Sequence, residues 1–154
     1  MPRVIAICVL LAALLPKHAV AHLGDTVSQV NAQYGHPLYE YAGQQHGEVV
    51  AKHKWKAYFV YVTYFRDKSE DETYIHQASD APFAPSELQS LLRAASLGMR
   101  WQKAKTVPMW LLTAHDGKTP LAIAGYTSKL PDLGWPCFGV STIPYARRHK
   151  IPGI

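Results

Sequence analysis

The sequence of 154 residues contains very little cysteine: Cys8 and Cys137 are the two thiols in the whole chain. Cys8 lies in an apolar run near the start, which we interpret below as a cleaved leader. The single remaining thiol cannot form an internal disulfide, so the fold must be held by a hydrophobic core. Cys137 is then either buried and inert or available for an intermolecular bridge, and burial is common for a lone thiol.

Motifs that carry out common chemistry are missing as well. No glycine-rich phosphate-binding loop occurs, and Ser141 lacks the Gly-x-Ser-x-Gly context of a hydrolase nucleophile. The carboxylates that stand closest together, at 70–72, fall in or beside a predicted turn, where we expect them to be solvated. The sequence therefore predicts no catalytic residue and no cofactor.

The histidines of the chain are scattered, with no His-x-His or His-Glu-x-x-His spacing of the kind that binds zinc. A hairpin could bring His46, His53 and His76 together, but exposed or hydrogen-bonded histidines are the simpler interpretation. We predict no metal site. A small secreted enzyme that uses Cys137 or a histidine metal cluster remains the alternative to a non-catalytic protein.

The first residues have the features of an export signal. Arg3 precedes an apolar run at 4–15, and Ala-Val-Ala at 19–21 is a cleavage site with small residues at both ends. The run is shorter than the ~20 residues of a membrane-spanning helix. We predict a signal peptide at 1–21 and one domain at 22–154 with a basic C-terminal tail, secreted or periplasmic and without a transmembrane segment after cleavage.

The predicted mature part is weakly basic. Removal of Arg3 and Lys17 leaves 14 basic residues against 11 acidic ones, a formal net charge of +3. The basic residues gather in three short runs, at 52–56, 100–105 and 147–150. Such runs are typical of a solvated face or tail. We therefore predict no nucleic-acid partner.

A short helix with both ends encoded follows the leader. Thr26 and Gln29 have the spacing of a capping box, Gly35 suits the end of a helix, and Pro37 prevents its continuation. A second capping box is predicted at Ser86 and Gln89. It precedes an apolar stripe at helical spacing, formed by Leu88, Leu91, Leu92 and Ala95.

The strongest strand signal covers residues 55–65, which are dense in aromatic and β-branched side chains. Alternation places the odd-numbered side chains on one face, which we interpret as the packed one, and the even-numbered side chains on the other. Tyr58 and Tyr64 then point outward together and are our predicted binding residues. Residues 48–54 are compatible with either a helical turn or a strand.

Short connections between further apolar runs predict antiparallel pairing, above all Asp116-Gly117 between residues 109–113 and 119–126. Residues 137–143 can add a last strand, and no internal repeat is visible. We predict an α+β fold: an antiparallel sheet of about four to six strands with two helices packed on one face.

The opening pattern Gly-x-Thr-x-x-x-Val-x-x-x-Tyr-Gly-x-Pro, which starts at Gly24, resembles the opening motif of the SmpA/OmlA-like group. It is also similar to the start of the repeats in β-lactamase inhibitory protein. The resemblance implies a helix packed on an antiparallel sheet and non-covalent protein binding outside the cytoplasm. This chain lacks the lipidation cysteine of the outer-membrane members and the paired cysteines of the inhibitor, so neither anchoring nor inhibition carries over.

These observations together predict an exported, non-catalytic binding domain. Its partner would be a protein or an envelope component, recognised through an aromatic sheet face that includes Tyr58 and Tyr64.

Overall fold

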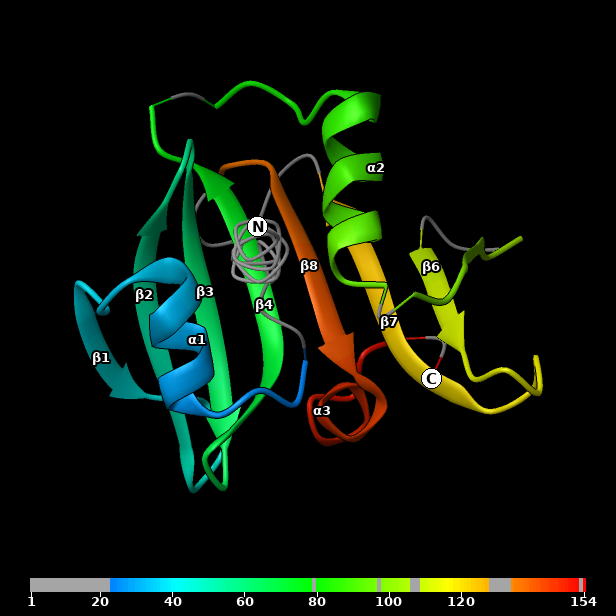
Figure 1. Ribbon diagram of the computed structural model, residues 1–154, viewed down its shortest axis with the longest axis horizontal. Coiled ribbons are helices and arrows are strands. Elements are labelled where there is room, and N and C mark those ends of the chain that lie inside the picture. Colours follow the sequence, from blue (N-terminus) through cyan, green and yellow to red (C-terminus); the bar gives the residue numbers. More distant parts are fainter. Residues whose placement is uncertain (1–22, 79, 97, 106–108, 128–133, 153) are drawn as a thin grey trace, which may run out of the picture.

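The computed structural model describes residues 23–78, 80–96, 98–105, 109–127, 134–152 and 154. The predicted signal peptide at 1–21 lies outside these residues. The strands of the described part are β1 (Tyr39–Ala42), β2 (Glu48–Trp55), β3 (Tyr58–Phe65), β4 (Lys68–His76), β5 (Trp101–Lys103), β6 (Met109–Thr113), β7 (Pro120–Thr127) and β8 (Cys137–Thr142). They form one 8-stranded sheet in the order β1-β2-β3-β4-β8-β7-β6-β5, antiparallel throughout (Figure 1).

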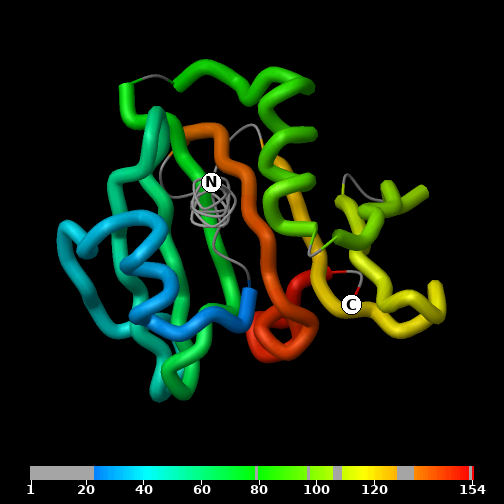
Figure 2. The backbone as a smooth tube through the Cα atoms, in the orientation of Figure 1, coloured from blue at the N-terminus to red at the C-terminus, as the bar shows by residue number. Residues whose placement is uncertain are grey.

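The sheet consists of two consecutive hairpin series that meet at one seam. Strands β1 to β4 pair in chain order, and so do β5 to β8. Between them the chain crosses to the other half of the sheet through helix α2 (Pro85–Ala94), as Figure 2 shows. The last strand then pairs with β4, from Asp71↔Ser141 to Tyr74↔Phe138. Each half therefore begins with a helix and continues with four strands.

Helix α1 (Val27–Tyr34) forms where the sequence predicts it. The backbone N–H of Gln29 donates to Thr26 Oγ1 at 3.3 Å, and Gln29 Oε1 accepts from the backbone N–H of Thr26 at 2.8 Å. The capping box is therefore confirmed. Gly35 follows the helix with φ of 82°, a conformation that glycine adopts without a steric penalty.

Helix α2 begins earlier than predicted. Its N-cap is Ala84, and Pro85 occupies the first turn, where a missing N–H costs nothing. The Glu87 carboxylate accepts from the backbone N–H of Ala84 at 2.9 Å. The predicted capping box at Ser86 and Gln89 is thus wrong by two positions, because Pro85 and Glu87 place the N-cap at Ala84.

A third helix, α3 (Ile143–Arg148), lies in the segment that was predicted to be a basic C-terminal tail. Thr142 caps it by accepting a hydrogen bond from the backbone N–H of Tyr145 at 3.2 Å. Ile143 and Ala146 are buried with Ile123 of β7. Pro144 lies in the first turn of this helix, so the segment predicted to be a basic tail is part of the folded domain.

The predicted long strand at 55–65 is interrupted near its start. A turn at 56–57 separates β2 from β3, Trp55 pairs with Tyr58, and Lys56 has φ of 51°. Residues 48–54 are therefore part of a strand. The next turn has two positive φ angles, 52° at Arg66 and 61° at Asp67, as a tight β-hairpin requires.

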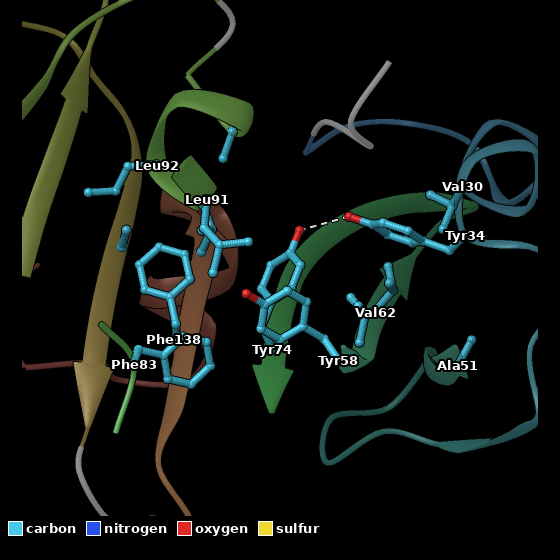
Figure 3. Close-up of a cluster of buried hydrophobic side chains, with 14 of the residues drawn as sticks. Val30, Tyr34, Ala51, Tyr58, Val62, Tyr74, Phe83, Leu91, Leu92 and Phe138 are labelled. Carbon is cyan, nitrogen blue, oxygen red and sulfur yellow. Dashed lines mark hydrogen bonds between the residues drawn. The ribbon is translucent and has the colours of Figure 1, made fainter. Parts of the chain in front are cut away.

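The main core lies between one face of the sheet and helices α1 and α2. Side chains from α1, α2, β3, β4 and β8 meet there (Figure 3). Tyr58 and Tyr64 belong to this core, with exposed fractions of 9% and 4%. The prediction that they point outward is wrong, because the even-numbered side chains of β3 face the helices.

A buried carboxylate sits within this core. Glu72 Oε2 accepts hydrogen bonds from Tyr74 Oη at 2.6 Å and from Tyr34 Oη at 3.0 Å. The two tyrosine oxygens are 2.7 Å apart, and Figure 3 marks their hydrogen bond. Burial is the main cause that raises the pKa of Glu72 from 4.5 to about 7, while the tyrosine hydrogen bonds lower it. Ionisation of Glu72 therefore opposes folding at neutral pH.

The predicted fold class, an α+β sheet of about four to six strands with two helices, is wrong. The described chain has an 8-stranded sheet and three short helices, so it is mostly β. Three elements account for the difference. Residues 48–54 are ambiguous in sequence, β5 is very short, and α3 lies in the segment predicted to be a basic tail.

Candidate binding face

The sheet face opposite α1 and α2 carries a group of aromatic side chains at its β1 end. We call Tyr39, Tyr41, Phe59 and Tyr61 the aromatic patch. Register places them together, because Tyr39 pairs with Lys52 and Lys52 pairs with Tyr61. Tyr39 and Tyr41 are 49% and 47% exposed, and their ring centroids are 6.1 Å apart. Large aromatic side chains exposed together are typical of contact surfaces.

Lys52 lies among these rings. Its Nζ is 3.9 Å from the centroid of Phe59, 5.3 Å from that of Tyr61 and 5.4 Å from that of Tyr39. These distances are within the range of cation–π attraction. The face therefore already holds one ammonium group against aromatic rings.

A pocket with a volume of about 430 Å³ opens on the same face and shares Tyr41 and Tyr61 with the aromatic patch. One row of paired residues crosses it, from Tyr41 through Val50 and Thr63 to Asp71. Since the side chains of directly paired residues lie on the same face, four neighbouring strands build the pocket together. Its remaining walls include Tyr61, Thr73, Ile75, Tyr145 and His149.

Two carboxyl groups of this pocket are buried, Glu48 with an exposed fraction of 3% and Asp71 with one of 8%; Asp71 lies at the end of the row. Ser141 Oγ donates to its Oδ1 at 2.5 Å, and Thr73 Oγ1 donates to its Oδ2 at 3.1 Å. Within the described residues it receives hydrogen bonds from hydroxyl groups and forms no ion pair. Burial raises the pKa of Asp71 to about 6, although both hydroxyls favour its charged form.

Helix α3 closes one end of the pocket through ion pairs. His149 Nε2 lies 2.8 Å from Glu48 Oε1, and Arg148 donates to the same oxygen at 3.2 Å and also to Glu70. Burial opposes the charge on Glu48, but the bonds from His149, the Gln45 backbone and Arg148 lower its pKa. These bonds fix α3 against β2 and β4.

A β-bulge in β4 contributes to this arrangement. Thr63 pairs with Asp71 and Tyr64 with Ser69, so Glu70 is the extra residue between them. A bulge bends its strand and redirects a side chain. Here it allows Glu70 to reach Arg148 while Asp71 stays in the pocket.

The residues named in the alternative enzyme hypothesis each have separate surroundings. Cys137 is 7% exposed, and burial is the main cause that raises its pKa to about 11, so the thiol stays protonated near neutral pH. His53 donates from Nδ1 to the Gly35 carbonyl oxygen at 2.9 Å, whereas His76 lies 2.9 Å from Glu87 and His46 is exposed. Among the described residues, no three metal-ligating side chains lie close enough to hold an ion.

Sequence reasoning missed the residues that line the pocket and the patch. Asp71 was interpreted as solvated, and Tyr145 and His149 lay in the expected tail. One signal could have identified the face: Lys52 and Lys54 alternate with the buried residues Ala51 and His53. This alternation indicates a strand with one solvent-exposed face.

Comparisons with known proteins give little further guidance. No protein-family model and no curated protein matches the chain. A cysteine-rich secretory protein from Staphylococcus aureus subsp. aureus Mu50 matches 80% of this chain at 11% identity, with a TM-score of 0.46. An extracellular protein containing an SCP domain from Bacillus anthracis str. Ames matches 83% of it at 10% identity, with a TM-score of 0.47. The chain covers 46% of each of these proteins, and a likeness of this degree assigns no function.

In the part of the chain that has been described, no helix is both long and apolar enough to span a bilayer.

Proposed function

We propose that this chain is an exported, non-catalytic domain that binds another protein through the aromatic patch. The observation that carries the proposal is the exposure of Tyr39 and Tyr41 beside Phe59 and Tyr61 on a sheet face that α1 and α2 leave uncovered. The leader-like start of the sequence and its resemblance to the SmpA/OmlA-like group support export and protein binding.

Charge indicates the kind of protein surface that fits. Lys52 and Lys54 lie on the same face as the patch, where they pair with Tyr61 and Phe59. The patch itself contains no carboxylate. A partner surface with apolar side chains and nearby carboxylates would cover the rings and match both lysines. Tyrosine gives such a contact a large area at a small entropic cost, because its side chain has few rotatable bonds.

The test uses the full chain as bait against the envelope and culture fluid of cells that produce it. Three proteins are compared: the wild type, a Tyr39→Ser/Tyr41→Ser double variant, and Trp135→Ser. Trp135 is 39% exposed and lies outside the patch, so it controls for the loss of an exposed aromatic ring. Circular dichroism confirms that each variant is folded.

We expect a partner that is captured by the wild type and by Trp135→Ser, and whose affinity falls at least tenfold in the double variant. Because both tyrosines are about half exposed, their removal should change stability little. A partner held equally by all three proteins, or no partner at all, would refute binding through this patch.

A further inference from the structure

The pocket contains a buried carboxylate, Asp71, that forms no ion pair among the described residues; the basic group that acts on it, His149, is bonded to Glu48. Asp71 is bonded by the hydroxyls of Ser141 and Thr73, and its ring of neighbours contains no lysine or arginine bonded to it among the described residues. A buried carboxylate normally has a counter-ion or enough hydrogen bonds to replace the lost hydration. Two hydroxyl donors use only part of the accepting capacity of a carboxylate.

We propose that this pocket binds a primary ammonium group, with the Asp71 carboxylate as its counter-ion. The proposal concerns a small cationic group and does not require the protein contact proposed above, although Tyr41 and Tyr61 belong to both the aromatic patch and the pocket. An ammonium group is compact and carries three donors, so it can reach the remaining lone pairs of Asp71 together with the hydroxyl oxygens of Thr63 and Thr73, which also line the pocket.

The walls of the pocket suit a cation. Tyr41, Tyr61 and Tyr145 all line it, and the faces of aromatic rings attract positive charge. Lys52 on the same sheet face is an example of an ammonium group placed over an aromatic ring, since its Nζ lies 3.9 Å from the Phe59 centroid. The volume of about 430 Å³ is ample for a straight alkyl chain that follows the ammonium.

The balance of charge around the pocket also favours a cation. Three carboxylates, from Glu48, Glu70 and Asp71, stand there against one arginine and one histidine, and both of these basic groups are held by Glu48. Even with His149 protonated, the region keeps a net negative charge. Anions are therefore excluded, and a neutral apolar ligand would leave Asp71 uncompensated.

A guanidinium fits less well than an ammonium. Bidentate binding needs both carboxylate oxygens free along one edge. Here Oδ1 and Oδ2 each already accept a hydroxyl hydrogen bond. An ammonium needs no such edge, so the pocket should prefer lysine-like groups to arginine-like ones.

Titration by two-dimensional amide NMR of the full chain tests the proposal with defined probes. The probes are n-butylammonium, its neutral counterpart 1-butanol, and three capped peptides, acetyl-Gly-X-Gly-amide, in which X is lysine, arginine or norleucine. The amides of Tyr61, Asp71 and Thr73 report on the pocket. Binding of butylammonium indicates a free amine as ligand, whereas binding of the lysine peptide alone indicates a lysine side chain from a protein.

Two variants and one matched control complete the experiment. Asp71→Asn keeps the shape of the side chain but removes its charge, and Asp67→Asn removes one exposed carboxylate at a turn where asparagine tolerates the positive φ. We expect Asp71→Asn to bind the ammonium probe at least tenfold more weakly than the wild type. Asp67→Asn should bind it as tightly as the wild type. Should Asp71→Asn fail to fold, Tyr61→Leu tests the aromatic wall, with an expected loss of about fivefold.

Three outcomes would overturn the proposal: no perturbation of the pocket by any ammonium probe, equal binding of 1-butanol or the norleucine peptide, or unchanged ammonium affinity in the pocket variants. Since none of these measurements involves a protein partner, their failure leaves the proposed function untouched. Conversely, a protein partner held equally by the wild type and by Tyr39→Ser/Tyr41→Ser would refute binding through the patch and would leave ammonium binding by the wild-type pocket unaffected.

Discussion

Ionisation of the buried Glu72 should lower the stability of this protein. Glu72 is 1% exposed, and burial raises its pKa from 4.5 to about 7 in the folded state. The folded protein therefore holds this proton more tightly than the unfolded chain does. The resulting stabilisation is fully present below about pH 4.5 and is lost as the pH rises through 7. The difference between these pKa values corresponds to about 3 kcal/mol.

The substitution Glu72→Gln should expose this effect, because the amide keeps an oxygen that can accept from Tyr34 or Tyr74 but cannot ionise. We expect the free energy of unfolding of Glu72→Gln, relative to the wild type, to rise by about 3 kcal/mol between pH 4 and pH 8. Urea denaturation at both pH values measures it. His53 has the opposite sign, since burial lowers its pKa, but it is common to both proteins and cancels in the comparison.

The control is Glu40→Gln, which removes the charge of an exposed glutamate on β1. The difference in the free energy of unfolding between Glu40→Gln and the wild type should change much less between pH 4 and pH 8 than it does for Glu72→Gln. The reasoning would be refuted if Glu72→Gln kept a constant difference from the wild type at pH 4 and pH 8, because Glu72 would then ionise equally easily in the folded and unfolded states.

Three further substitutions or treatments test the packing. Glu87→Ala removes the acceptor for the N-terminus of α2 and for Tyr58, and we expect a loss of about 1–3 kcal/mol in denaturant unfolding, mostly restored by Glu87→Gln. Gly43→Ala places a Cβ 2.5 Å from the Cβ of Glu48. It should cost about 1–3 kcal/mol, seen as a lower Tm, and an unchanged Tm would contradict the close approach. Cys137 should resist a thiol reagent at pH 8 until urea is added, and rapid reaction of the folded protein would contradict its burial.

Local features of this fold could be predicted from sequence, because their partners are close in the chain. Thr26 and Gln29 form the predicted capping box over three positions. The turn at Asp116 and Gly117 joins β6 to β7 as expected, with φ of 66° at the glycine. In each case a specific side chain satisfies a nearby backbone group, so the signal does not depend on the rest of the molecule.

The orientation of β3 could not be predicted from β3 alone. Its even-numbered face offers Tyr58, Val60, Val62 and Tyr64, and its odd-numbered face is nearly as apolar. The deciding information lies on the neighbouring strand, where Lys52 and Lys54 pair with the odd-numbered residues. The solvent-exposed face of β3 can be identified only when its pairing with β2 is known.

The pocket was invisible to sequence reasoning for a similar reason. Asp71 and Ser141 are 70 positions apart, whereas Tyr145 lies in α3 and His149 directly follows it, in a segment whose basic composition concealed the helix. None of these residues has a local motif. Their common position follows only from the pairing of β4 with β8.

The pairing of β4 with β8, which joins the two hairpin series, constrains the order in which the molecule folds. Each series can form from contacts between neighbours in the chain, but the hydrogen bond from Ser141 to Asp71 must wait until the final strand has docked. Helix α3, which closes the cavity, comes later still in the chain. A chain that ends before β8 and α3 would lack this cavity, so the cavity forms only after these late elements have docked on β4.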